Sequence, residues 1–159
     1  MTWFRRAHEA VAPTDEDPDD SPEALLRSMF EQVREVNRHA GRLPNEAVVI
    51  ARRLLDAVRE VIETSSDRDL DIHAVVSLRG ILGDYLPTTL RTYLALDPEI
   101  VDTPRPTGKT PSDALIEQLA VLWSSATDVL DATRAQDADA LMSQGSFLRT
   151  KFSGSDLDL

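Results

Sequence analysis

The amino-acid sequence predicts an all-α protein, arranged as an antiparallel helical bundle of about five to six helices. Apolar residues recur at intervals of three or four positions over most of the chain, which is the spacing of a helix with one buried face. Aromatic residues make up only 5% of a chain that is 42% hydrophobic, so the core must consist mainly of Leu, Val, Ile and Ala. Such side chains suit the packing of helix on helix. At 159 residues the chain is long enough for one domain with its own core.

The net charge of −11 is unevenly placed along the chain. Residues 1–20 hold six acidic residues against two arginines, and residues 97–159 hold eleven against five basic residues. Residues 21–96 are nearly neutral, with eleven acidic residues against ten arginines. A nucleic-acid partner is not expected, because contacts to phosphates need a basic face.

Cysteine is absent, which excludes disulfides, thiolate metal sites and a cysteine nucleophile. No apolar run approaches the ~20 residues that span a bilayer. The N-terminus lacks the apolar region of a signal peptide. We therefore expect a cytoplasmic protein, with peripheral contact to a membrane as the alternative.

Residues 1–20 are predicted to be a disordered acidic tail, because Pro13–Asp20 has no apolar residue to offset the entropy lost on ordering. Trp3 and Phe4 precede two arginines and form an aromatic–basic tip. One interpretation is a weak anchor for a partner protein or an anionic membrane surface. The other, which we favour, is a frayed chain start with two stray aromatics.

The first helix is expected to begin at Ser21, because serine at the N-cap followed by proline and glutamate is a strong helix start. Its apolar stripe runs to Ala40, and Gly41 is predicted to cap its C-terminus. The second helix begins near Pro44, and the short connection predicts an antiparallel hairpin. Its broad apolar stripe consists of Ala47, Val48, Ala51, Leu54, Leu55, Val58, Val61 and Ile62.

A polar turn over Thr64–Asp71 follows the second helix. Alternating aspartates in Asp67–Asp71 resemble the opening of a calcium loop. Ile72 stands where that loop needs glycine, and Leu78 where it needs glutamate. We reject a calcium site and interpret the aspartates as N-cap candidates for the next helix.

A third helix with a proline kink is predicted over residues 72–96. Pro87 removes one backbone hydrogen bond to the carbonyl of Gly83 and pushes Leu86 away from helical geometry. The apolar stripe nevertheless keeps its register on both sides of the proline. Two alternatives stay open: one kinked helix, which the preserved register favours, or two helices, the second beginning at Pro87.

Residues 97–111 contain four prolines and cannot form regular structure, so they predict a long crossover. A fourth helix is expected to start at Ser112. Asp137 is predicted to cap a separate last helix, with Gly145 weakening its middle. These limits define a single helical domain over residues 21–153 and a short acidic tail over residues 154–159.

No catalytic, cofactor-binding or metal-binding residue stands out. The three histidines, His8, His39 and His73, lie far apart and lack a second ligand at metal-binding spacing. The sequence has no nucleophile elbow, phosphate loop or dinucleotide motif. Gly80 and Gly83 are predicted to let a neighbouring helix approach closely rather than to cradle a phosphate. We therefore expect a protein that is not an enzyme and binds no cofactor.

The candidate interaction residues lie around the proline. Tyr85 and Tyr93 flank Pro87 at a distance of about two helical turns, with Arg79 and Arg91 nearby. The two hydroxyls would be presented together at a groove. In the competing interpretation, which we favour, both rings belong to the core and each hydroxyl reaches a backbone carbonyl.

Two stretches resemble the bacterial XpaC-like family, which is named for 5-bromo-4-chloroindolyl phosphate hydrolysis. Asp84–Leu90 followed by Tyr93–Leu96, DYLPTTL and YLAL, resembles the YLP-x-T-L-x-x-Y core of that family. Residues 144–152, QGSFLRTKF, resemble the C-terminal helix of its members. The resemblance covers about the last half of the chain and implies a helical protein, often associated with tellurite-type resistance. Neither motif is catalytic, so the activity in the family name is not carried over.

The sequence thus predicts a non-enzymatic interaction or scaffold protein in a bacterial stress- or envelope-associated system. A protein partner of unknown identity is expected, and homo-oligomers are compatible with the pattern. A phosphate-ester hydrolase, or an activator of one, is the first alternative. A peripheral membrane protein that uses Trp3 and Phe4 is the second.

Overall fold

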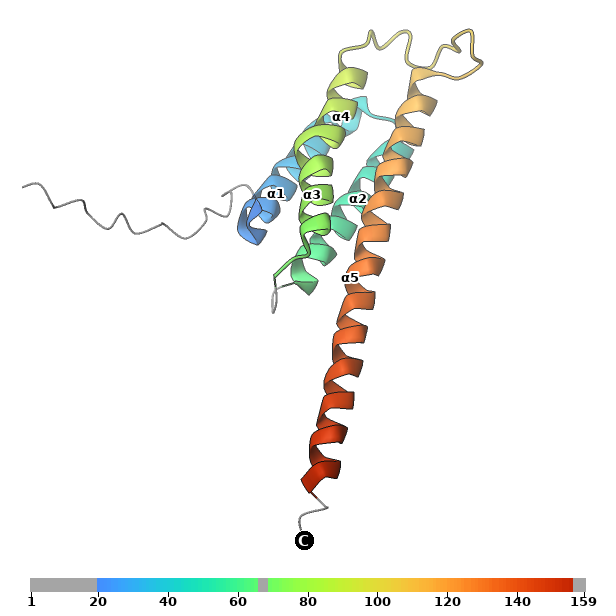
Figure 1. Cartoon of the computed structure of the whole chain (residues 1–159). Coiled ribbons are helices and arrows are strands. Elements are labelled where there is room, and N and C mark those ends of the chain that lie inside the picture. The colour runs from blue at the N-terminus through green and yellow to red at the C-terminus, as the bar shows by residue number, and fades with distance from the viewer. Residues whose placement is uncertain (1–19, 66–68, 156–159) are drawn as a thin grey trace, which may run out of the picture.

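A computed structural model describes residues 20–65 and 69–155, and every regular element within them is helical (Figure 1). These residues form four helical rods. The rods are α1 (Pro22–His39), α2 (Asn45–Thr64), the continuous run of α3 (Ile72–Gly80), η3 (Ile81–Tyr85) and α4 (Leu86–Leu94), and α5 (Pro111–Ser155). The all-α class is confirmed, whereas the expected number of helices is not. Most of the two predicted acidic tails, residues 1–19 and 156–159, lies outside the described residues.

The start of α1 follows the sequence expectation. The hydroxyl of Ser21 accepts a hydrogen bond of 3.1 Å from the backbone N–H of Ala24, and Pro22 opens the helix. This bond satisfies one of the N–H groups that a helix N-terminus leaves without an internal partner.

The end of α1 differs from expectation, because Gly41 is not a left-handed C-cap. Gly108 is the one glycine with a positive φ among the described residues. The chain instead tightens into a 3-10 turn, η2 (Ala40–Arg42), and Leu43 then turns to an extended conformation with its side chain buried. Burial of Leu43 favours this tight turn over a glycine cap.

The centre of the core is α2. All eight residues of its predicted apolar stripe are buried, together with Ala57. Figure 1 shows α2 between α1 and α5, and α1 and α2 form the expected antiparallel hairpin. The guanidinium of Arg53 lies 5.5 Å from the ring centroid of Trp123, so a cation–π contact links the α2 and α5 surfaces beside the core.

The run from α3 to α4 is one continuous helix with a wide turn inside it. The carboxylate of Asp71 caps α3 by accepting a 2.8 Å hydrogen bond from the N–H of His73, as the sequence predicts. In η3 the helix widens to a π turn, in which the N–H of Leu86 bonds to the carbonyl of Ile81, five residues earlier.

Pro87 comes directly after this wide turn, in the first turn of α4. The missing N–H of Pro87 is tolerated there, because the π turn has already interrupted the usual bonding of each N–H to the carbonyl four residues earlier. The expectation that Leu86 leaves helical geometry is wrong: its φ is −65° and its ψ is −52°. Leu82, Leu86 and Leu90 are all buried, so packing of the apolar stripe holds the run together.

The crossover from α4 to α5 is a series of hydrogen-bonded turns. The backbone N–H of Gly108 donates to the carbonyl of Arg105 over 2.8 Å, and Gly108 adopts a φ of +84°. The N–H of Ser112 donates to the carbonyl of Val101 over 3.0 Å. This bond fixes the crossover against the beginning of α5.

A single helix of 45 residues, α5, replaces the two helices expected after the crossover. It begins at Pro111, one residue before the predicted start. Asp137 caps no new helix but lies inside α5, and Gly145 is also accommodated within it. The alanine-rich segment around Asp137 has high helix propensity, which favours continuation over a break. No helix among the described residues has the length and apolar character needed to cross a membrane.

Candidate functional site

The structure separates the two tyrosines that the sequence places together. Tyr93 is buried, with 7% of its surface exposed, whereas 58% of Tyr85 is exposed. The π turn uses one residue more than an α turn, so Leu86 rather than Tyr85 reaches the core after Leu82. The two hydroxyls therefore do not form a joint groove.

Tyr93 is a structural residue that joins α4 to α5. Its hydroxyl lies 3.1 Å from the hydroxyl of Ser112, which in turn donates a 2.8 Å hydrogen bond to the carboxylate of Asp102. The ring lies in the core, as we expected, but the hydroxyl contacts a side chain rather than a backbone carbonyl.

Tyr85 borders a shallow, open hollow on the outer side of the α3–η3 run. The hollow is lined by residues that include Val76, Arg79, Gly80, Asp84 and Tyr85, so charged groups of both signs lie beside apolar surface. The Tyr85 ring lies against Gly80, where an added Cβ would stand 3.2 Å from the Cε2 atom of the ring. Gly80 thus makes room for this ring, and not for a neighbouring helix as predicted.

The other candidate residues are spread over different surfaces. The guanidinium of Arg79 forms an ion pair of 2.8 Å with Asp20, which links α3 to the start of α1. Pro87 is half-buried and Arg91 is exposed on α4. Trp3 and Phe4 lie outside the described residues.

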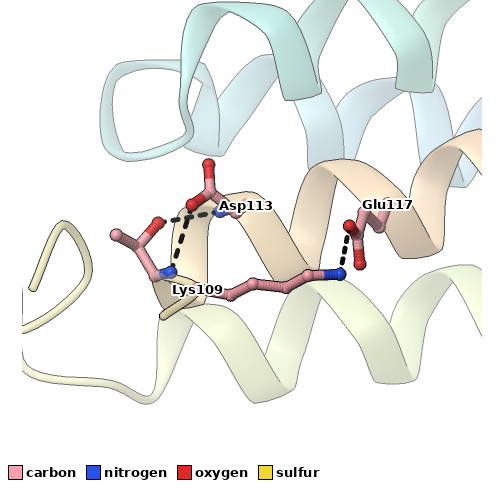
Figure 2. Close-up of polar contacts among 4 residues, drawn as sticks. Lys109, Asp113 and Glu117 are labelled. Atoms are coloured by element: carbon pink, nitrogen blue, oxygen red, sulfur yellow. Dashed lines mark hydrogen bonds and ion pairs between the residues drawn. The ribbon is translucent and has the colours of Figure 1, made fainter. Parts of the chain in front are cut away.

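Polar contacts at the start of α5 form a capping box (Figure 2). The N–H of Asp113 donates to the Thr110 hydroxyl over 3.0 Å, and the N–H of Thr110 donates to the Asp113 carboxylate over 3.1 Å. Hydrogen bonding to Thr110, first through its backbone and then through its side chain, lowers the pKa of Asp113, and the charge of Lys109 adds to this effect. Lys109 also pairs with Glu117 over 2.5 Å. These interactions fix the start of the helix.

Metal-binding geometry does not appear in residues 20–65 and 69–155, which contain no group of three or more His, Cys, Asp or Glu side chains able to hold an ion. His39 lies 3.4 Å from a Glu35 carboxylate oxygen, four residues earlier on the same helix. His8 lies outside the described residues.

A second candidate surface was not singled out from the sequence: the projecting end of α5, which we define as residues 138–155. Arg134 pairs with Glu60 of α2 over 2.6 Å, close to the end of the bundle. Beyond this contact α5 continues alone into solvent (Figure 1). Residues 138–151 are exposed except for the half-buried Gly145. At 1.5 Å per residue, the projecting end is ~27 Å long.

Four large apolar side chains are exposed on this projecting end. They are Leu141 (70% exposed), Met142 (73%), Phe147 (65%) and Leu148 (40%). The apolar spacing of the last predicted helix contained Leu141 and Leu148, but sequence spacing alone does not show that no other helix covers them. Their exposure makes the projecting end a candidate contact surface.

No family model matches the chain, and no curated protein or solved structure is found to be similar to it. The resemblance of Asp84–Leu90 to the XpaC-like family therefore stays a prediction.

Proposed function

We propose that this protein is a non-enzymatic helical interaction or scaffold protein. The observation that carries the proposal is the projecting end of α5, on which Leu141, Met142 and Phe147 are each more than half exposed. Contiguous apolar surface on a soluble protein marks a contact site far more often than single exposed residues do. The bundle serves as the rigid base from which this contact element extends.

The physical chemistry of an isolated helix supports the same proposal. A single helix of this length is marginally stable in water, and most helical stability in proteins comes from packing of an apolar face. Gly145 and several serines lower the helix propensity of the projecting end further. A binding partner that covers Leu141 and Leu148 would supply the missing packing energy.

The hollow beside Tyr85 is a smaller surface of the same kind. Val76 and Tyr85 are both exposed there, so the hollow offers apolar surface to a partner segment. Following the resemblance to the XpaC-like family, we place the protein in a bacterial stress- or envelope-associated system.

Photo-crosslinking in cells of the native host tests this proposal. A photoreactive amino acid is introduced at Met142 or Phe147, and at Val121 as a matched control. Val121 is 65% exposed on the same helix but lies alongside the bundle. We expect covalent adducts from positions 142 and 147 and none from position 121. The absence of adducts at both projecting positions, or equal adducts at position 121, would overturn the proposal.

A further inference from the structure

We propose that the projecting ends of α5 from two copies of this chain pair side by side in antiparallel orientation and form a homodimer. This inference rests on the proposed function, because it names the occupant of the same apolar surface. Three features of the described residues carry it: the spacing of the apolar side chains, the distribution of charge, and the length of the projecting end.

The apolar side chains have the spacing of a coiled-coil seam. Ala138, Leu141, Gly145 and Leu148 follow one another at intervals of three, four and three residues, which is the heptad pattern of helices that pack along their length. Ala138, Leu141 and Leu148 are exposed in the single chain. The small Gly145 in the middle of the seam lets two helix backbones approach closely.

The net charge of α5 changes sign between residues 128–139, which form the base of the projecting end, and residues 140–155. Residues 128–139 hold four aspartates and one arginine, whereas residues 140–155 hold Arg149 and Lys151 and no acidic residue. A second helix laid parallel would place like charges opposite each other. A second helix laid antiparallel places the basic end of each copy against the acidic base of the other.

The charge positions also fix the register of the pair. When the twofold axis passes Gln144, Asp137 lies opposite Lys151 of the second copy, and both residues flank the apolar seam. The same register brings Leu141 next to Leu148 of the second copy. Each contact then occurs twice, as the closed symmetry of a dimer requires.

The length of the projecting end fits this register. With the axis at Gln144, position 155 of one copy lies opposite position 133 of the other, and Thr133 is the last residue of α5 that is buried among those whose burial the structure describes. Each tip therefore reaches the base of the second bundle without overlapping it. The two bundles lie at opposite ends of the shared pair of helices.

A cysteine experiment tests the antiparallel pairing directly, because the natural chain contains no cysteine. In the proposed dimer, Gln144→Cys places two thiols next to the axis, where mild oxidation links the copies. Ala138→Cys, which also lies on the seam, is the matched control, since its two copies lie ~18 Å apart along the pair, far beyond the reach of a disulfide. We expect a covalent dimer from Gln144→Cys and none from Ala138→Cys. Linkage of both variants to the same extent would indicate a parallel pair, and linkage of neither would exclude the dimer.

Sedimentation of the full chain tests the charge and apolar contacts. We expect a concentration-dependent dimer that Leu141→Glu abolishes and that the control Val121→Glu leaves intact. Lys151→Asp in one chain, or Asp137→Lys in another, is expected to weaken the dimer at least tenfold. Mixing these two chains restores it, because each reversed pair then meets its opposite. Failure of the mixture to associate, or a monomeric natural chain at all concentrations, would overturn the inference.

The mass of the photo-crosslinked adducts distinguishes failure of the homodimer from failure of the proposed function. Adducts from position 142 with twice the mass of the chain support the homodimer. Adducts of other masses without the doubled mass overturn the homodimer and leave the proposed function in place.

Discussion

The Tyr93 hydroxyl donates its hydrogen to the Ser112 hydroxyl, 3.1 Å away, across the gap between α4 and α5. The direction follows because Ser112 has one hydroxyl hydrogen and uses it in the 2.8 Å bond to Asp102. A chain of two hydrogen bonds therefore connects α4, the crossover and the start of α5. It fixes the long crossover at the point where the longest helix begins.

Removing the Tyr93 hydroxyl and removing the Ser112 hydroxyl are expected to destabilise the protein by different amounts. Tyr93→Phe removes one donor and costs about 1 kcal/mol of unfolding free energy. Ser112→Ala costs about 2 kcal/mol, because it leaves the buried Tyr93 hydroxyl without this acceptor and also breaks the bond to Asp102. Urea denaturation measures both values, and the double variant gives their coupling. Equal losses from the two single variants would show that the bond from Ser112 to Asp102 contributes nothing to stability.

Replacing two glycines by alanine is expected to have opposite effects. Gly83 lies in the π turn with no atom within 4 Å of an added Cβ, so Gly83→Ala should stabilise the helix by about 0.5–1 kcal/mol. Gly108 has a φ of +84°, so Gly108→Ala should destabilise by about 1–2 kcal/mol. Thermal and urea unfolding measure the two differences. A destabilising Gly83→Ala would show that the π turn requires glycine.

The capping box at the start of α5 predicts a dependence of stability on pH. The pKa of Asp113 lies below its ordinary value of 3.8 in the folded protein, because Thr110 bonds to the ionised carboxylate. Its contribution is therefore present above about pH 4 and is lost as the pH falls through the lowered pKa. We expect the stability difference between the natural chain and Asp113→Asn to be largest near neutral pH and to shrink below pH 4. Urea unfolding measures the stability difference between the two chains. An equal difference at pH 3 and pH 7 would show that the Asp113 carboxylate does not contribute to stability.

A buried amide in α1 predicts a stabilising substitution. Gln32 is 9% exposed, and among the described residues the Oε1 atom of its side chain is a buried acceptor without a hydrogen-bond partner. Because such an acceptor has lost its water without gaining a bond, Gln32→Met should raise the unfolding free energy by about 1 kcal/mol. Gln32→Glu is the control and should destabilise, since it would bury a charge. A neutral or destabilising Gln32→Met would indicate that a bound water satisfies the amide.

Local patterns in the sequence were sufficient to predict α2 and the starts of α1 and α3. The eight stripe residues of α2 are all buried, because helical periodicity depends only on neighbours in the same element. The sequence likewise predicts the capping roles of Ser21 and Asp71, since a cap involves residues within three positions of each other.

Features that depend on other elements could not be predicted from local patterns. Pro87, four residues after Gly83, is compatible with a kink, a new helix or a π turn, and the burial of Leu86 and Leu90 in the core favours the π turn. Asp137 has the same local sequence whether it caps a helix or lies within one. Leu141 and Leu148 have the spacing of a buried face, but the shorter helices of the bundle end before they reach them.

Removing residues 140–159 is expected to leave the stability of the bundle unchanged within about 0.5 kcal/mol. The side chains of Leu141 and Met142 contribute little to folding of the single chain, because both are mostly exposed. Leu119→Ala is the contrasting variant and should cost about 2–5 kcal/mol, since Leu119 of α5 is fully buried. Urea unfolding at low protein concentration measures both, because association would add concentration-dependent stability to the full chain. A loss above 1 kcal/mol on truncation would show that the projecting end packs against its own bundle in solution, and the same measurement at high concentration should reveal extra stability only in the full chain.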